Sequence, residues 1–203
     1  LGADPGSESF YQSSKGHAEK LLKSEQSPKF RTSIVQPSVI FGPNDKFTNR
    51  FAKLLSITRG VLPLACPKSR LQPVYVGDVA QAIINIIEND SLAGQVYELG
   101  GPEIYSLKQI VEYIGEVSGI NARIIPLNSL LSALQAQTLE FFPGKPFSKD
   151  NLRALKKDSV CKRVDSLDIL GIRPTRMSEI LPSYLGEKNI KGRYSEYRNL
   201  AGR

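Results

Sequence analysis

The sequence predicts an α/β fold, because segments with a helical pattern alternate with short β-branched strands. In the candidate helices, apolar residues recur three and four positions apart, whereas Val, Ile and Tyr concentrate in the candidate strands. Clusters of Gly, Pro and Asn separate the two kinds of segment. The length of 203 residues and the hydrophobic content of 40% suit a globular chain of this class.

The chain carries a net charge of +7, which could suit nucleic acid, an anionic membrane or a phosphate-bearing ligand. The basic residues are spread out, however, and no nucleic-acid motif occurs, so we expect no nucleic-acid partner and interpret the charge as favouring solubility. No apolar run approaches the length that spans a bilayer. Cys66 and Cys161 are far apart and fit no metal-ligand spacing, so no metal site is expected.

The sequence pattern of the first half of the chain predicts three helices and three strands. After a loop rich in Gly and Pro, a helix is expected from about Ser9 to Ser24, with Ser7 or Ser9 as its cap and Phe10, Ser14, Ala18, Leu21 and Leu22 as its apolar or small stripe. The elements expected next are a strand at 30–41 that must stop or bulge at Pro37, a helix at 47–58, a strand at 71–76, a helix at 79–89 capped by Asp78 and a strand at 95–99.

The second half is predicted to be mainly helical. Residues 128–142 form an amphipathic segment, for which core packing is the favoured interpretation and a lipid- or partner-facing surface the alternative. Residues 186–203 are basic and poor in apolar residues, which is typical of a flexible tail. The other expected elements are a helix at 107–118 capped by Ser106, a strand at 123–127, a short helix at 148–157, an irregular stretch at 167–172 and a helix at 176–185 capped by Thr175.

Tyr11 and Lys15 are the candidate catalytic residues. Their spacing of four places both side chains on one face of the first helix. An ammonium near a phenol favours the phenolate, which is the chemistry of a general acid/base for hydroxyl–carbonyl interconversion. The alternative is structural, since such pairs are common in helices as a half-buried ring beside a solvated amine.

Several motifs, in their order along the chain, carry a resemblance to a known family. They are Tyr11-x-x-x-Lys15, the Gln-Pro-Ser-Val-Ile-Phe-Gly-Pro run at 36–43, the Gln-Pro-Val-Tyr-Val-Gly-Asp-Val-Ala run at 72–80 and the Tyr-Glu-Leu-Gly-Gly-Pro run at 97–102. This series resembles the C-terminal part of an extended short-chain dehydrogenase/reductase of the NAD-dependent epimerase/dehydratase superfamily. Residues 41–52, 72–76 and 167–172 further resemble the atypical branch related to the nucleotide-binding accessory subunit of respiratory complex I.

The resemblance implies the C-terminal part of a doubly wound Rossmann-type sheet plus a smaller α+β substrate or lid domain. Residues 1–60 and 71–100 would belong to the dinucleotide-binding domain. Residues 61–70 and 101–185 would form the small domain, followed by the tail at 186–203. Strands missing from the sheet would leave an open edge, through which the chain could dimerise.

The same resemblance assigns roles to individual residues. Tyr11 would be the acid/base, and Lys15 would bind the nicotinamide ribose and lower the pKa of the tyrosine. Pro37, Ser38 and Val39 would border the nicotinamide. The implied cofactor is NAD or NADP, held by the full-length parent and not tightly by this chain, which contains no glycine-rich phosphate loop.

A second departure from the family pattern concerns the substrate. Sugar-nucleotide members usually place Arg-Asp where this chain has Leu71 and Gln72, and that arginine clamps a pyrophosphate. Leu71 cannot do so, and Arg70 should point to the opposite face of its strand.

These features favour a cofactor-binding accessory or structural role related to the NADH dehydrogenase complex. The alternative is an active oxidoreductase, epimerase or dehydratase that uses the Tyr11–Lys15 pair, and a weaker third hypothesis is a basic module at a membrane surface. The expected partners are the dinucleotide and a respiratory complex or membrane surface. The expected location is cytoplasmic, or peripheral to the inner membrane on the mitochondrial matrix side.

Overall fold

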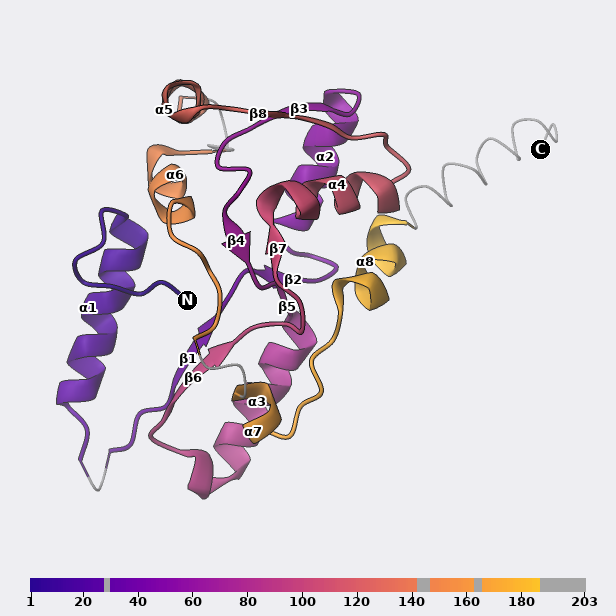
Figure 1. The fold of residues 1–203 in the computed structure, drawn as a ribbon. Helices are drawn as coiled ribbons and strands as arrows, with labels where there is room; N and C mark the ends of the chain where they lie inside the picture. Colours follow the sequence, from indigo (N-terminus) through magenta and orange to yellow (C-terminus); the bar gives the residue numbers. More distant parts are fainter. Residues whose placement is uncertain (28–29, 142–146, 163–165, 187–203) are drawn as a thin grey trace.

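The computed structural model describes residues 1–27, 30–141, 147–162 and 166–186 and confirms the α/β class (Figure 1). Most of the predicted tail lies outside these residues. The helices are α1 (Phe10–Ser24), α2 (Thr48–Ile57), α3 (Val76–Glu88), the 3-10 helix η1 (Asp90–Leu92), α4 (Leu107–Val117), α5 (Ser129–Leu139), α6 (Lys149–Leu155), α7 (Ser166–Ile169) and α8 (Met177–Leu185). The strands are β1 (Ile34–Pro37), β2 (Ile40–Phe41), β3 (Val61–Leu64), β4 (Arg70–Leu71), β5 (Val74–Tyr75), β6 (Val96–Leu99), β7 (Tyr105–Ser106) and β8 (Arg123–Pro126).

The described strands pair in four two-stranded ladders. The ladders β1–β6, β2–β5 and β3–β8 are parallel, and β4–β7 is antiparallel. The predicted strand at 30–41 divides after Pro37, as expected for a residue without an N–H. At the division, the N–H of Ser38 donates to the carbonyl of Leu99 (2.8 Å), and the carbonyl of Val39 accepts from the N–H of Val74 (3.0 Å). Ser38 and Val39 therefore connect the two central ladders.

Two strands of this arrangement do not follow from the sequence pattern. Strand β3 contains Pro63, and proline argues against a strand in sequence reasoning. It nevertheless pairs in parallel with β8 from Val61 to Leu64. Strand β7 is only two residues long and precedes the capping box of α4, where Ser106 and Gln109 bond reciprocally as the predicted Ser106 cap requires.

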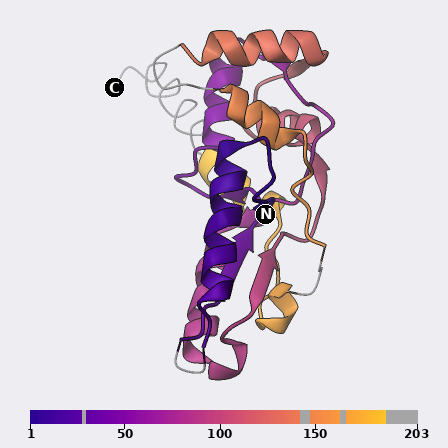
Figure 2. The same cartoon turned by 90° about the vertical axis from the view of Figure 1, so that its left-hand side faces the viewer.

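The buried apolar residues form two clusters. The larger one lies between α2, α4 and α8 and the strands β2, β3 and β4, and the smaller one lies between α3, β6 and α7. Figure 1 shows α3 and α7 together at one end of the molecule and α5 at the other. Figures 1 and 2 both show α1 along one side, with α6 beside its N-terminal end. No helix in the described part of the chain is long and apolar enough to cross a membrane.

Two predicted helix caps are wrong, because the residues concerned bind each other. Asp78 lies within the first turn of α3, whose N-cap is Tyr75. Its carboxylate accepts hydrogen bonds from the N–H and the hydroxyl of Thr175, both at 2.8 Å. Thr175 therefore does not cap α8, which begins after Arg176, and the pair ties α3 to the segment leading into α8. The stretch predicted as irregular at 167–172 includes most of α7.

The apolar faces predicted for two helices are exposed. In α1, Phe10 is 77% exposed and Leu21 is 65% exposed, and the buried residues are Gln12 and Gly16. In α5, Leu130 and Leu134 are exposed while Ser132 and Ala136 are buried, so core packing by the leucines is wrong. Ile83 and Ile87 of α3 are likewise exposed, although Val79, Ala82 and Ile86 are buried.

Candidate functional site

Tyr11 and Lys15 lie on one exposed face of α1, as their spacing predicts. The ammonium of Lys15 lies 5.9 Å from the centroid of the Tyr11 ring, within the range of a cation–π contact. The tyrosine side chain is largely exposed rather than half-buried, which disfavours a purely packing role for it. Ser9 caps the helix by accepting from the N–H of Gln12, so Tyr11 is in the first turn.

The first turn of α1 is held by Asp150 of α6, a residue that sequence reasoning misses. Its carboxylate accepts from the N–H of Phe10 (2.6 Å), the N–H of Tyr11 (3.3 Å) and the hydroxyl of Ser9 (3.1 Å). A carboxylate at this position satisfies free N–H groups at the positive end of the helix. The sequence gives no signal for the contact, because Asp150 lies far along the chain and follows the capping serine of its own helix, Ser148.

Two basic residues, one in α6 and one just after it, also contact the start of the chain. The guanidinium of Arg153 lies 5.8 Å from the centroid of the Phe10 ring and donates to the carbonyl of Glu8 at 3.3 Å. The ammonium of Lys157 lies 2.7 Å from a carboxylate oxygen of Asp4. Together with Asp150, these contacts fix Tyr11 relative to α6.

A cavity of about 480 Å³ brings together four of the five predicted site residues. It is lined by Tyr11, Lys15, Pro37 and Ser38, together with Gln36 and Glu19. The amide of Gln36 donates to the carboxylate of Glu19 at 2.6 Å, which links β1 to α1 across this cavity. The C-terminal end of the parallel strand β1 and one face of the preceding helix, α1, thus meet at this cavity.

A second cavity of about 400 Å³ is also lined by Tyr11. Its other lining residues include Pro37, Ser38, the fifth predicted residue, Val39, and the apolar side chains of Phe47, Phe51, Leu71 and Leu107. Both cavities share Leu1, Tyr11, Gln12, Pro37 and Ser38. Tyr11 therefore lines both a cavity that contains Lys15 and a cavity with apolar walls.

Ser38 is buried and its hydroxyl is fully engaged within the chain. It donates to the carbonyl of Ser159 (2.7 Å), lies 3.1 Å from the hydroxyl of Ser159 and accepts from the N–H of Gln72 (3.3 Å). The side chain of Gln72 donates to the carbonyl of Gly101 and accepts from the N–H of Cys161. Burial and nearby Glu98 raise the pKa of the Cys161 thiol to about 11, so the thiol stays protonated at neutral pH.

Leu71 and Arg70 are placed as their alternation on a strand predicts. Leu71 is buried and lines the apolar cavity, whereas Arg70 is exposed and lies 3.9 Å from the carboxylate of Asp158. An arginine therefore does not enter the cavity from either position.

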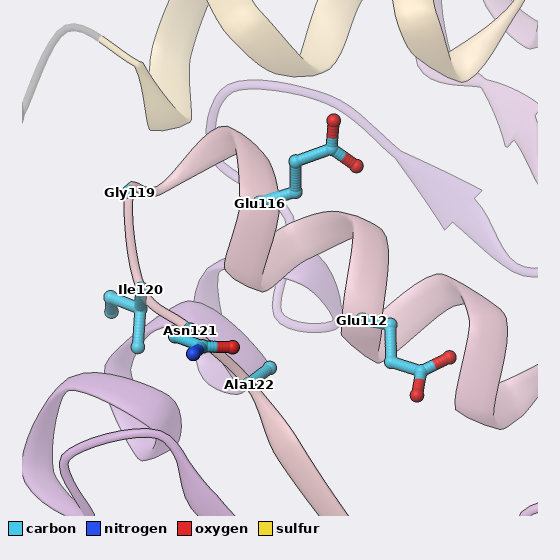
Figure 3. Close-up of a pocket in the computed structure, with 6 residues that line it drawn as sticks. All are labelled: Glu112, Glu116, Gly119, Ile120, Asn121 and Ala122. Atoms are coloured by element: carbon cyan, nitrogen blue, oxygen red, sulfur yellow. The ribbon is translucent and has the colours of Figure 1, made fainter.

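Another hollow, at the C-terminal end of α4, lies apart from these residues (Figure 3). It is lined by Glu112, Glu116 and residues 119–122, and the two carboxylates in Figure 3 do not converge. Glu112 pairs with Lys108 at 3.5 Å. In the described part of the chain, no group of three or more His, Cys, Asp or Glu side chains could hold a metal ion.

The residues around the cavity of Lys15 fit one end of a dinucleotide. An ammonium and a phenol at a cavity wall suit ribose hydroxyls, and the strand end at Pro37 and Ser38 offers a flat backbone surface to a ring. The pyrophosphate would need a glycine-rich loop at a helix N-terminus, which this sequence does not contain. The chain thus provides groups for the nicotinamide end only.

Comparisons with known proteins show what the chain is similar to. Residues 3–98 match the 3-beta hydroxysteroid dehydrogenase/isomerase family. The chain is 32% identical over 158 residues to "NADH dehydrogenase [ubiquinone] 1 alpha subcomplex subunit 9, mitochondrial" of Dictyostelium discoideum, covering 75% of this chain and 42% of that protein. It is 28% identical over 170 residues to the subunit of the same name from Rattus norvegicus, covering 83% and 44%. The chain therefore spans less than half the length of these relatives.

Solved structures share the fold. A nucleoside-diphosphate-sugar epimerase from Staphylococcus aureus superposes with a TM-score of 0.63 at 20% identity, over 90% of this chain and 61% of that one. A dTDP-glucose 4,6-dehydratase from Streptomyces venezuelae, solved with NAD bound, superposes with a TM-score of 0.61 at 16% identity, over 94% and 52%. The predicted Rossmann-type fold is confirmed. The chain is similar over residues 3–98 to the 3-beta hydroxysteroid dehydrogenase/isomerase family and, over three quarters of its length, to a subunit of mitochondrial NADH dehydrogenase.

Proposed function

We propose that the chain is part of a dinucleotide-binding accessory subunit of a respiratory NADH dehydrogenase. The observation that carries this proposal is the 32% identity to subunit 9 of Dictyostelium discoideum over 75% of the chain. The cavity that gathers Tyr11, Lys15, Pro37 and Ser38 supports the dinucleotide-binding part of the proposal. A subunit of this kind would lie in the mitochondrion, at the periphery of the inner membrane on its matrix side.

In this proposal the cofactor is NAD or NADP. Lys15 and Tyr11 would hold the nicotinamide ribose, and Pro37, Ser38 and Val39 would border the ring. When bound, the cofactor supplies the hydride chemistry that no amino-acid side chain provides. The chain itself orients the ring, and tight binding would depend on a phosphate-binding segment that this sequence does not contain.

The test is to purify the natural protein that carries this sequence under native conditions. We expect it to migrate with NADH dehydrogenase activity on a native gel, and its denatured extract to release NAD(P)(H) in a stoichiometric amount. A protein that migrates apart from the respiratory complex and releases no dinucleotide would contradict the proposal.

The alternative function is an active oxidoreductase, epimerase or dehydratase, and the observation that favours it is that Tyr11 lines two cavities. A phenol at that point can exchange a proton with a hydroxyl or carbonyl group of a substrate. In the natural protein, Tyr11→Phe should then abolish a substrate-dependent change in nicotinamide absorbance while bound dinucleotide remains. Tyr113→Phe, a half-buried tyrosine of α4, is the matched control.

Two expectations about the structure of the protein are also proposals. One is the division into a dinucleotide-binding part and a small lid domain. The other is dimerisation through an open sheet edge, which is supported by β1 having β6 as its only partner strand among the described residues. Sedimentation of the isolated chain as a monomer over a wide concentration range would contradict the dimer.

A further inference from the structure

We propose that the apolar cavity beside Tyr11 binds an anionic amphiphile, a molecule with an unbranched apolar chain and a single phosphate or carboxylate group. The inference rests on the proposed function, because it takes this cavity as the substrate side of the dinucleotide site. The proposed ligand differs from the UDP-glucose bound in solved structures of the same fold. The volume of the cavity, about 400 Å³, is within the range of small-molecule sites.

The floor of the cavity is apolar. Leu71 and Leu107 are almost completely buried, and Phe47, Phe51 and Leu155 are partly buried around them. Three of these residues lie in the helices α2, α4 and α6, Phe47 caps α2 and Leu71 lies in β4, and all five belong to or pack against the larger core cluster. An apolar chain that enters the cavity would remove this surface from water, which is the main favourable term in such binding.

Two polar side chains that line the cavity are buried, Gln12 and Ser38, and the hydroxyl of Ser38 has no spare hydrogen-bonding capacity. Ser38 donates its proton to the carbonyl of Ser159, so the proton shared at 3.1 Å between the two hydroxyls comes from Ser159. Both hydroxyl protons are thereby used within the chain. A sugar hydroxyl placed against Ser38 would lose hydrogen bonds to water without replacement, which costs on the order of 1–3 kcal/mol for each unpaired group.

The rim of the cavity is positively charged. Lys46, Arg50 and Lys157 are exposed at its edge, and Asp158 is the one acidic lining residue in the described part of the chain. Lys157 is already paired with Asp4, and Asp158 is paired with Arg70. Lys46 forms no ion pair with any residue that the structure describes, and it can therefore take the anionic group of a ligand.

Floor and rim together define the orientation of the ligand. The apolar chain would lie on Leu71, Leu107, Phe47 and Phe51, with the anionic group at Lys46. Tyr11 lines the same cavity, so a hydroxyl or carbonyl group on the apolar chain could reach the phenol.

The experiment is titration calorimetry of the natural protein with butyl, hexyl and octyl phosphate, each below its micelle concentration. Affinity should rise by about fourfold for each added methylene until the cavity is filled. Inorganic phosphate, octyltrimethylammonium and UDP-glucose should bind at least tenfold more weakly than octyl phosphate. Affinity independent of chain length, or tighter binding of UDP-glucose, would overturn the proposal.

Two lysine variants locate the anionic group. Lys46→Gln, just before α2, should weaken octyl phosphate binding by about fivefold to tenfold, while Lys53→Gln, within α2 but outside the cavity, should leave it unchanged. Both residues are exposed, so neither variant is expected to affect folding. Equal effects of the two variants would show a general electrostatic attraction and would contradict a site at Lys46.

The outcomes separate this inference from the proposed function. A protein that carries dinucleotide and migrates with NADH dehydrogenase, yet binds octyl phosphate no better than inorganic phosphate, retains the proposed function and refutes the amphiphile site. A protein that binds octyl phosphate with the expected chain-length dependence, but carries no dinucleotide, retains the cavity assignment and refutes the proposed function.

Discussion

Helices α1 and α4 show the same kind of sequence pattern but are held in the molecule in opposite ways. In α4, Leu107, Ile110, Val111 and Ile114 are at most 1% exposed. In α1, the corresponding apolar positions lie on the surface, and the contacts with the rest of the chain are made by polar groups. An amphipathic pattern therefore indicates a helix. It does not show whether other described residues cover the apolar face of that helix.

The difference follows from what each helix packs against. Helix α4 contacts α2, α8, β7 and β8, which together surround its apolar face. Helix α1 contacts α6 and the loop that precedes it, and the loop passes over Gly16. The helix that carries the candidate acid/base is thus attached by hydrogen bonds and a close backbone contact rather than by a hydrophobic core.

The largest expected effect tests the hydrophobic attachment of α4. Ile114→Ala should lower the free energy of unfolding by about 2–5 kcal/mol, because it opens a cavity at a position with no solvent exposure. Leu21→Ala on α1 should change it by less than about 0.5 kcal/mol. Urea denaturation of the two variants measures both values. Similar losses would show that the apolar face of α1 is covered in solution.

The next effect tests the backbone contact at Gly16. A Cβ added at this residue would lie 2.3 Å from the nitrogen of Pro5 and 2.4 Å from the carbonyl carbon of Asp4. Gly16→Ala should therefore destabilise the protein by about 1–3 kcal/mol, although the same change in an open helix stabilises it. Gly6→Ala, where the nearest atom would be 3.5 Å away, is the control. Stabilisation by Gly16→Ala in thermal melting would mean that the loop does not pass over α1.

A smaller effect tests the polar attachment of α1 to α6. Asp150→Ala removes the acceptor of the N–H groups of Phe10 and Tyr11 and should cost about 1 kcal/mol, as for other helix caps. Amide hydrogen exchange should become faster at both residues. Asp168→Ala, at an exposed position of α7, should leave these amides unchanged. Unchanged exchange in Asp150→Ala would contradict the contact.

The smallest effect concerns the exposed ion pair between Asp4 and Lys157. The ammonium of Lys157, followed by the N–H of Gly6, lowers the pKa of Asp4. A lowered folded pKa means that the stabilisation is present above the unfolded pKa and is lost as pH falls below about 4. An NMR titration of the Asp4 carboxyl carbon should show its pKa rising in Lys157→Gln but not in Lys156→Gln. Equal titration curves in the two variants would contradict the pair.

Local signals predicted much of the fold and part of the candidate site. Spacing placed Tyr11 and Lys15 on one face, Pro37 marked the end of β1, and Ser106 marked the start of α4. Contacts between distant segments left no local signal, as with Asp150 at α1 or the Asp78–Thr175 pair. Burial of the leucines of α5 was mispredicted because composition does not identify the partner of an apolar face.

The parallel ladders also constrain how the chain can assemble. Strand β1 begins its pairing at Ile34 and Val96, and β3 begins at Val61 and Arg123, so each ladder closes a long loop and the two loops overlap along the chain. Closing such loops loses entropy before any strand contact compensates for it. Neither ladder can form during synthesis until β6 or β8 has left the ribosome, whereas α4 needs only local contacts to begin. Among the described elements, α1 precedes the strands of both ladders along the chain, and its partner α6 follows them.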